Sequence, residues 1–300
     1  MPSIQPIRSF MFVPGHRANM IDKCAGSGAD AVILDLEDSV PEPDKAAARE
    51  LVASKLEQLA QAGQRVYVRI NRSRHLYSFE DVMAVVQPGL EGVVLSMPNG
   101  PEDVALACAL VSEAEERNGV AAGSVGVVPA LETPRSLQRV DDIVQAERVR
   151  VVIGASAKNA DLQRAMGWEW QPDSLESLYM KSRVVMACRA AGKLPIGGIW
   201  QQVHDLEGVR NYALQDRKLG MAGTTILHPS NAAVVNAIFM PSAEDVAYYE
   251  GMALAFEDGL RQGRASVMYK GEHIDAAHAK TAADKVALAK SYQVKNGSAA

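Results

Sequence analysis

Short apolar runs alternate with longer amphipathic stretches along the first three quarters of the chain. The short runs are rich in Val, Ile and Leu, whereas the stretches 45–62, 101–118 and 175–191 repeat apolar positions at helical spacing. This alternation is typical of βα units and a parallel sheet. The predicted strands are residues 7–13, 31–36, 66–70, 92–97, 125–131, 149–154, 196–200 and 224–227.

Eight strands with intervening helices before residue 230 predict an α/β fold of the (β/α)8 TIM-barrel type. An open doubly wound sheet is the alternative, but it calls for a glycine-rich GxGxxG turn after the first strand. The turn here reads Val13-Pro14-Gly15-His16-Arg17 and lacks that pattern. In a barrel, catalytic residues are expected where the strands end.

The pattern changes after His228-Pro229. Residues 242–262 predict one long helix, residues 263–290 form a more polar segment with a turn at Lys270-Gly271, and the last ten residues are expected to fray. We therefore predict a catalytic barrel over residues 1–240 and a C-terminal helical extension or lid over residues 241–300.

Composition narrows the class of protein. A hydrophobic content of 48% in 300 residues can bury a large core, and a net charge of -5 without a basic run argues against nucleic acid and anionic membranes as partners. The three cysteines are far apart, which argues against disulfides and CxxC zinc sites. With no signal-peptide pattern at the start and no membrane-length apolar run, a cytoplasmic protein is expected.

Two carboxylates follow neighbouring predicted strands. Glu132 ends the apolar run 125–131, and Asp161 comes shortly after the run 149–154. A charged side chain that closes a buried strand is costly unless something pairs with it. Two oxygen ligands that leave room for water and substrate suit Mg²⁺, so this pair is the candidate metal site.

A second polar cluster is predicted at the same end of the barrel. Asp35, Glu37 and Asp38 follow the second strand, and Arg69 lies on the side of the third strand that we assign to the barrel interior. Crowded acids have perturbed pKa values, and an interior guanidinium suits an oxyanion or a substrate carboxylate. The alternative is structural: the acids pair with Arg69 or Arg8 and only hold the mouth together.

The chain resembles the citrate lyase β-subunit-like (CitE-like) CoA-ester lyases of the HpcH/HpaI aldolase superfamily. The DLED-x-V block, with Lys45 and Arg49 behind it, is the most specific part, and the matches extend from about residue 7 to residue 290. The matching segments are residues 8–15, 28–40, 68–71, 131–134, 161–162 with Gly167, 226–229, 239–242 and 271–276.

This resemblance implies a Mg²⁺-dependent TIM barrel that assembles as a homo-oligomer, often a trimer or hexamer. Its metal ligands fall on Glu132 and Asp161, its substrate-contacting arginine on Arg69, and further mouth acids on Glu37 and Asp38.

Outside the mouth, the resemblance places CoA contacts near Arg17 and Lys23. A catalytic aspartate, delivered by the C-terminal segment to the barrel of a neighbouring subunit, falls on Asp275.

The implied activity is cleavage of a 3-hydroxy-acyl-CoA, such as citramalyl-CoA or malyl-CoA, into acetyl-CoA plus pyruvate or glyoxylate. A thioesterase or a CoA-independent class II aldolase on the same site, and a non-catalytic CoA-ester-binding subunit of a lyase complex, are the alternatives. The chain departs from the family pattern at Asn99, where a lysine is usual, and in a longer link between Gly154 and Asp161, which contains Lys158.

Overall fold

The computed structural model of the chain describes residues 5–154 and 157–297. Two compact units follow one another along the chain, Met1–Phe239 and Met240–Ala300. No helix in the described ranges combines the length and the apolar character needed to cross a membrane.

Unit 1 alternates strands with helices along its whole length. Its strands are β1 (Ser9–Pro14), β2 (Ala31–Asp35), β3 (Arg65–Ile70), β4 (Leu90–Leu95), β5 (Gly126–Pro129), β6 (Val151–Ile153), β7 (Leu194–Gly197) and β8 (Gly223–Ile226). Its α-helices are α1 (Ala18–Cys24), α2 (Lys45–Gln61), α3 (Phe79–Val85), α4 (Pro101–Arg117), α5 (Pro134–Gln138), α6 (Val140–Ile143), α7 (Asp161–Met166), α8 (Leu178–Ala190), α9 (Leu206–Leu219) and α10 (Pro229–Phe239).

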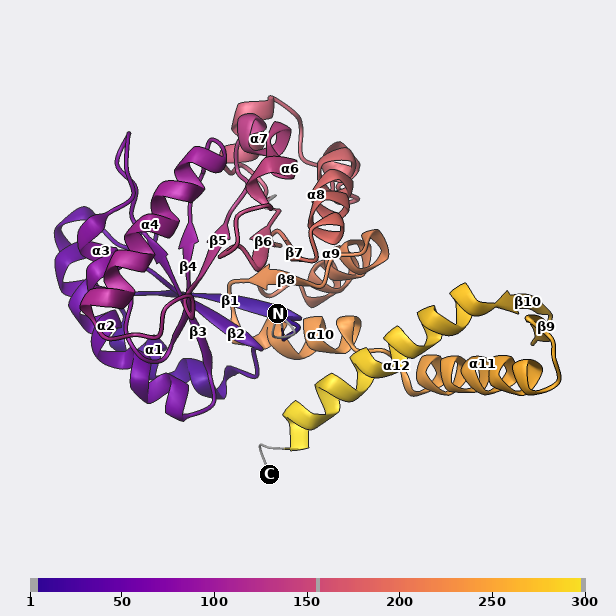
Figure 1. Ribbon diagram of the computed structural model, residues 1–300. Helices are drawn as coiled ribbons and strands as arrows, with labels where there is room; N and C mark the ends of the chain where they lie inside the picture. The colour runs from indigo at the N-terminus through magenta and orange to yellow at the C-terminus, as the bar shows by residue number, and fades with distance from the viewer. Residues whose placement is uncertain (1–4, 155–156, 298–300) are drawn as a thin grey trace. The chain divides into compact units, whose positions relative to one another are not determined.

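The eight strands form one parallel sheet in the order β5-β4-β3-β2-β1-β8-β7-β6. Its end strands meet through isolated parallel bridges that join Val127 to Val149 and Ala130 to Ile153. The sheet thus closes on itself into a nearly complete barrel with helices around it (Figure 1). The predicted TIM-barrel architecture is confirmed.

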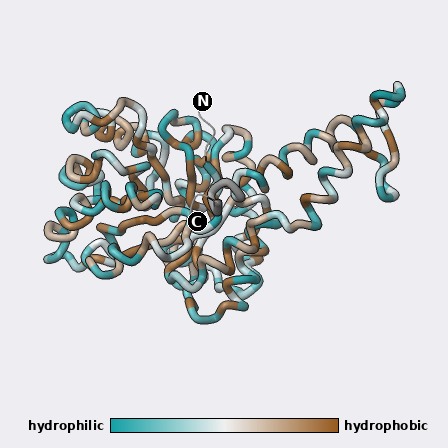
Figure 2. The backbone as a smooth tube through the Cα atoms, turned by 90° about the horizontal axis from the view of Figure 1, so that it is seen from below, coloured by the Kyte–Doolittle hydropathy of each residue, from teal (hydrophilic) through white to brown (hydrophobic). Residues whose placement is uncertain are grey.

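Two apolar layers hold the barrel together. Val66, Val68 and Ile70 of β3 belong to the layer between the sheet and the helices, whereas Tyr67 belongs to a smaller cluster inside the barrel and meets Phe10 edge-on, with ring centroids 4.8 Å apart. In Figure 2 the tube changes repeatedly between hydrophobic and hydrophilic stretches along its length. The predicted assignment of the two faces of β3 is therefore correct.

The strand register brings the mouth residues together. Asp35, the last residue of β2, is paired with Arg69 of β3. The backbone N–H of Gly15 donates to the Asp35 carbonyl at 2.8 Å, and a Cβ at residue 15 would lie 2.5 Å from that oxygen. A glycine is needed here because any side chain would push β1 away from β2 at the mouth, where the two strands end.

Strand β7 differs from its prediction. It begins at Leu194 and ends at Gly197, so the expected strand 196–200 was placed about two residues too late. The Thr225 hydroxyl donates to the Gly197 carbonyl at 3.1 Å, and the Thr224 hydroxyl donates to the Gly198 carbonyl at 2.6 Å. These two carbonyls accept hydrogen bonds from side chains, the backbone pairing of β7 ends at Gly197, and residues 198–200 belong to the loop.

Unit 2 is a helical hairpin with a short β-hairpin at its turn. It consists of α11 (Ala243–Arg261), β9 (Ser266–Tyr269), β10 (Glu272–Asp275) and α12 (Ala276–Gly297). Met252, Phe256, Ile274 and Ala282 form its apolar core. The turn predicted at Lys270-Gly271 joins β9 to β10, whereas the 22-residue helix α12 that follows was not identified within the polar segment 263–290. Its alanine-rich and lysine-rich sequence favours a helix by propensity rather than by a strong apolar stripe.

Candidate functional site

A cavity of about 430 Å³ opens at the C-terminal ends of the barrel strands. Its charged lining consists of four carboxylates, those of Asp35, Asp38, Glu132 and Asp161, and the guanidinium of Arg69. Five of the residues predicted for the mouth or weighed there therefore share one cavity. Ser39, Gln201 and Thr225 also line it and were not identified from the sequence, since nothing in their local pattern marks them.

Arg69 is the centre of an ion-pair network. Its Nε and Nη2 donate to the two oxygens of Asp35 at 2.6 and 2.8 Å, and its Nη1 lies 3.0 Å from Glu37 Oε2 and 3.3 Å from Asp38 Oδ2. The guanidinium lies over the ring of Phe12, and the distance from Arg69 Cζ to the ring centroid is 5.1 Å. The side chain is thus held rigidly, with its charge facing the cavity.

Asp35 is the residue that fixes Arg69 in place. Burial alone would raise the pKa of its carboxyl, but the hydrogen bonds and charge of Arg69, with further hydrogen bonds from Ser39 and Glu37, hold that pKa below its usual value. Asp35 is therefore an ionised structural partner. The pairing of Asp35 with Arg69 that the structural alternative expected is present, whereas Arg8 binds Asp30 instead, through Nε at 2.8 Å and Nη2 at 2.9 Å.

Glu37 and Asp38 are adjacent in the sequence, but they differ in burial and in their access to the cavity. Burial raises the pKa of Glu37 to about 7, against the opposing charge of Arg69 and with help from the nearby Asp38 and Asp35. Asp38 lines the cavity and its side chain is 67% exposed. Glu37 contacts Arg69 but does not line the cavity, so any role it has in chemistry requires an intervening water molecule.

Glu132 ends the segment that follows β5. A capping box holds it: the Thr133 side chain accepts from the Ser136 N–H at 3.0 Å and the Ser136 side chain accepts from the Thr133 N–H at 3.2 Å. Burial raises the pKa of Glu132 to about 7; Arg69 opposes this rise, whereas Glu37, Asp161 and Asp38 add to it. Within the described parts of the chain, no side chain donates a hydrogen bond to its carboxylate.

Asp161 is the first residue of α7 and is one-third exposed. It forms an ion pair with Arg164 of the same helix and lines the cavity opposite the Arg69 network. The longer link before it therefore still delivers the carboxylate to the mouth. Lys158 in that link lies against Trp170, with its Nζ 5.0 Å from the ring centroid.

The carboxylate excess fits a divalent cation. Four acids face one guanidinium in the cavity lining, and Glu132 lacks a donor among the described residues. Over the same residues, no group of three or more Asp, Glu, His or Cys side chains could enclose a metal ion. Two protein carboxylates that leave the remaining positions to water and substrate are the usual arrangement for Mg²⁺.

The rest of the cavity wall is apolar. Phe12, Ala130, Ile153, Ile199 and Leu227 come from β1 and from the strands and loops on the β5–β8 side of the barrel. The cavity therefore has a charged half, supplied mainly by β2, β3 and the segment after β5, and an apolar half. A ligand with a charged end and a hydrocarbon or thioester portion would suit both halves.

The remaining predicted residues lie elsewhere. Arg17 and Lys23 are exposed on either end of α1 and do not line the cavity. Asn99 does not line the cavity either, and it binds Asp103 through its backbone N–H at 2.8 Å and its side-chain amide at 3.1 Å. Asp275 belongs to unit 2, where its carboxylate contacts His278. The roles predicted for Arg17, Lys23 and Asp275 stay predictions.

The chain is similar to proteins that act on CoA esters. It is 30% identical to an L-malyl-CoA/beta-methylmalyl-CoA lyase of Cereibacter sphaeroides, over 94% of both chains. It is 26% identical to a (3S)-malyl-CoA thioesterase of the same species, over 95% of both. The fold matches CitE of Mycobacterium tuberculosis, solved with magnesium, acetoacetate and coenzyme A, with a TM-score of 0.74, 23% identity and coverage of 95% of this chain and 98% of that one.

A family model provides the most direct assignment. The model described as HpcH/HpaI aldolase/citrate lyase matches residues 8–229, a range that includes all of strands β1 to β8. The matched range also contains every charged residue of the cavity. The chain belongs to the HpcH/HpaI aldolase/citrate lyase family.

Proposed function

We propose that this protein is a Mg²⁺-dependent carbon–carbon lyase that cleaves a carboxylate-bearing 3-hydroxy-acyl-CoA, such as citramalyl-CoA or malyl-CoA. One observation carries the proposal: four carboxylates and a single, rigidly held guanidinium line the same cavity at the mouth of the barrel. The name of the 30% identical relative, a malyl-CoA and methylmalyl-CoA lyase, supports the CoA-ester class.

Glu132 and Asp161 are the residues that would hold Mg²⁺. Both line the cavity, and the charge of Asp161 contributes to the raised pKa of Glu132, so it disfavours the ionised form of Glu132 when no cation is near. A bound Mg²⁺ would supply Lewis acidity and a template for the substrate hydroxyl and its neighbouring carboxylate.

The protein side chains would then accept the hydroxyl proton and stabilise the negative charge that develops. Asp38, or Glu37 through a water molecule, accepts the proton of the 3-hydroxyl group. As the C2–C3 bond breaks, its electron pair passes to the thioester enolate and the C3 oxygen becomes the carbonyl of pyruvate or glyoxylate. Arg69, fixed by Asp35, stabilises the negative charge of the enolate.

The last step needs a proton at C2 of the enolate, which yields acetyl-CoA. The resemblance assigns this role to the segment that contains Asp275, supplied from unit 2 of a neighbouring copy. The proposal therefore includes a homo-oligomer, and mixing two inactive variants tests that part. An Arg69→Ala chain combined with an Asp275→Asn chain should recover activity in mixed assemblies, because some mouths then contain both intact groups.

A substrate screen tests the central claim. The purified protein is incubated with citramalyl-CoA, malyl-CoA and methylmalyl-CoA, with and without Mg²⁺, and both fragments are identified by mass spectrometry. We expect Mg²⁺-dependent release of acetyl-CoA or propionyl-CoA together with an α-keto acid or glyoxylate. Glu132→Gln serves as the matched inactive control, since it keeps the side-chain volume and removes the charge.

Thioester hydrolysis is the second candidate. The observation that favours it is the 26% identity, over 95% of both chains, to a (3S)-malyl-CoA thioesterase. The same screen separates the two reactions, because a thioesterase releases free CoA and an intact hydroxy acid. Free CoA without any carbon–carbon cleavage would contradict the lyase proposal.

A further inference from the structure

The apolar wall of the cavity begins one interior position away from Glu132. Ala130 and Glu132 line the cavity, whereas Leu131 between them belongs to the outer apolar layer. A parallel bridge joins Ala130 to Ile153, and the Leu131 N–H donates to the Ile153 carbonyl at 2.8 Å. Ala130 and Ile153 both belong to the apolar cluster inside the barrel, and both line the cavity. A carboxylate at the mouth therefore adjoins an apolar surface.

Ala130 leaves more room than its neighbours inside the barrel. Bulky branched side chains usually fill the interior layers of this fold. The inner cluster follows this rule with Val94, Val128 and Ile153, but at residue 130 the side chain ends at Cβ. Because Ala130 lines the cavity, the volume that a branched side chain would fill there is open to a ligand.

The charges of the lining restrict what a substrate can carry. Among the described residues, Arg69 is the only cation that lines the cavity, and it already meets three carboxylates. Four carboxylates line the same cavity, so even a bound divalent cation would leave an excess of negative charge. A second free carboxylate on the substrate would lie among these acids or against apolar side chains, and an unpaired charge is costly in either place.

Two cations that are close to Asp161 in the sequence do not change this balance. The Nζ of Lys158 lies 5.0 Å from the ring centroid of Trp170, and Arg164 forms an ion pair with Asp161. Neither Lys158 nor Arg164 lines the cavity, and Gln201, which does, carries no charge. Within the described parts of the chain, the apolar half thus offers no cation to a charged arm of a substrate.

We propose that Ala130, together with Ile153, determines specificity by accepting a small alkyl group on C3 of the substrate. This inference rests on the lyase function proposed above and narrows its substrate class. The substrate is then a tertiary alcohol with one free carboxylate, such as citramalyl-CoA or its C3-ethyl homologue, and the keto acid released is pyruvate or 2-oxobutyrate. Malyl-CoA has only hydrogen to offer this surface, and citryl-CoA brings a second carboxylate to it.

The connectivity of C3 supports this placement. C3 carries the hydroxyl group, the carboxylate, C2 and the alkyl group on one tetrahedral centre. In the proposed reaction the first two are held at Glu132 and Asp161, and C2 turns toward Arg69. The alkyl group then lies on the side of Glu132 away from Arg69, which comes from β3, whereas Ala130 directly follows β5 and Ile153 ends β6.

The competing explanation is that this wall contacts the CoA arm, which all candidate substrates share. Changes in the wall would then affect every ester to the same extent. An alkyl subsite instead changes the ratio between esters that differ only at C3, because only the alkyl group meets the altered side chain.

The experiment measures kcat/KM for four CoA esters with hydrogen, methyl, ethyl or carboxymethyl on C3. One methyl group in an apolar pocket changes this quantity by about 10–200-fold, so the wild type should prefer the methyl ester to the hydrogen ester by at least about tenfold. The carboxymethyl ester should be the poorest substrate. Ala130→Val should lower the methyl-to-hydrogen ratio by about 10–200-fold, because the added methyl groups occupy the space of the substituent.

Two further variants complete the set. Ile153→Val removes one methylene group from the wall, so the ethyl-to-methyl ratio should rise; this variant also keeps the test decisive if Ala130→Val does not fold. Ala222→Val is the matched control, because Ala222 packs against the same inner cluster but does not line the cavity. Its order of preference should be that of the wild type. Melting temperatures show whether the added methyl groups disturb packing.

Binding of the keto acids provides a readout that does not depend on turnover. Isothermal titration calorimetry in the presence of Mg²⁺ compares pyruvate, glyoxylate and oxaloacetate. The wild type should bind pyruvate most tightly, and Ala130→Val should lower the ratio of the pyruvate affinity to the glyoxylate affinity.

Specific results would overturn the inference. A carboxymethyl or hydrogen ester cleaved at least as well as the methyl ester would refute the alkyl subsite, and so would an unchanged methyl-to-hydrogen ratio in folded Ala130→Val. Carbon–carbon cleavage of none of the four esters would refute the proposed lyase function itself. These outcomes are distinct, because the first group requires an active wild-type lyase.

Discussion

Strand β3 carries two arginines that face the barrel interior at opposite ends. Arg65, at the N-terminal end, binds Glu91 through Nε at 2.9 Å and Nη2 at 2.9 Å, and donates to the carbonyls of Gln5 and Pro6 at 3.3 and 3.1 Å. Arg69, four residues later, meets the carboxylates of Asp35, Glu37 and Asp38. One strand thus presents the same side chain in two different electrostatic settings.

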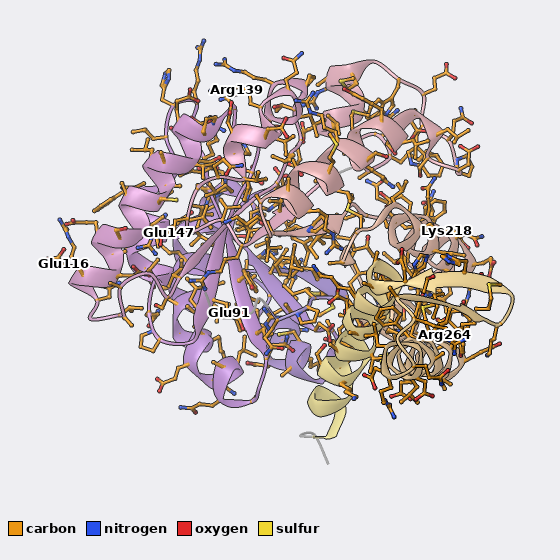
Figure 3. All side chains as sticks on the ribbon, turned by 45° about the vertical axis from the view of Figure 1, so that its right-hand side comes forward. Glu91, Glu116, Arg139, Glu147, Lys218 and Arg264 are labelled. Atoms are coloured by element: carbon orange, nitrogen blue, oxygen red, sulfur yellow. The ribbon has the colours of Figure 1, made fainter. Side chains whose placement is uncertain are left out.

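The difference shows which end is prepared for a ligand. At the N-terminal end of β3, which we call the floor of the barrel, the carboxylate of Glu91 balances the guanidinium of Arg65. Neutral carbonyls accept hydrogen bonds from Arg65 Nη1, and the Tyr67 hydroxyl donates to Glu91 at 2.9 Å. At the mouth, carboxylates exceed cations and Glu132 has no donor among the described residues. Figure 3 labels Glu91 beside the strands, in contrast to Glu116 at the outer end of α4. The floor is balanced in charge, as befits a region that stabilises the fold, whereas the mouth has an excess of negative charge.

The largest effect is expected from Arg69→Ala. Loss of a preorganised oxyanion donor should lower kcat by about 10²–10³-fold, which corresponds to about 2.7–4 kcal/mol in the barrier. Arg69→Lys should recover only part of this loss, because an ammonium cannot reproduce the two-pronged contact with Asp35. Steady-state kinetics on folded variants is the measurement, and near-normal turnover by Arg69→Ala would disprove its assigned role.

Metal binding should distinguish Glu132 from Glu91. At a Mg²⁺ concentration 100 times the dissociation constant, the wild type should gain about 2.7 kcal/mol in free energy of unfolding. Glu132→Gln should lose most of this gain, and Glu91→Gln at the floor should keep it. Denaturant unfolding with Mg²⁺ or with EDTA measures the gain, and equal gains in all three proteins would refute the metal assignment.

Asp35→Asn tests the network that holds Arg69. The hydrogen bonds of a buried charged group contribute about 1.5–3 kcal/mol each, so the variant should lose stability on this order at pH 7. Because the folded pKa of Asp35 is lowered, its contribution is present above its unfolded pKa of about 3.9 and is lost as the pH falls through the folded value. The stability gap between wild type and variant should therefore shrink below about pH 4. A gap that stays constant down to that range and beyond would contradict the assignment.

The smallest effect is expected at the floor. Glu91→Gln removes the charge of a side chain that is 39% exposed, so it should cost no more than about 1 kcal/mol in free energy of unfolding. Its turnover should equal that of the wild type. A large fall in kcat for this variant would remove the distinction between the two ends of β3.

Several features of the mouth could be predicted because they depend on local periodicity. Alternation along β3 correctly placed Arg69 inside the barrel and the flanking Val68 and Ile70 outside. The positions of Glu132 and Asp161 after neighbouring strands placed both at one opening. These predictions succeed because a parallel barrel collects its strand ends at one face, whatever the distance in sequence.

Other features could not be recognised from periodicity. Asp35, rather than Glu37, lines the cavity, because the β2–β3 register sets Asp35 directly beside Arg69. The pairing of Arg8 with Asp30 depends on how the N-terminal ends of the strands are arranged. Helix α12 was missed because its sequence has only a weak apolar pattern. The helix packs against α11, and this contact cannot be read from the sequence of α12 alone.

The sequence by itself determined the strand-and-helix order, the closed parallel architecture and the set of residues from which a site could be built, because these depend on apolar periodicity and on the end at which each strand stops. Only the tertiary structure decided which carboxylates Arg69 neutralises, which one is left for a cation, and that His278 meets Asp275. Charge balance and pKa values depend on distances and burial, and these arise only when separate segments pack together.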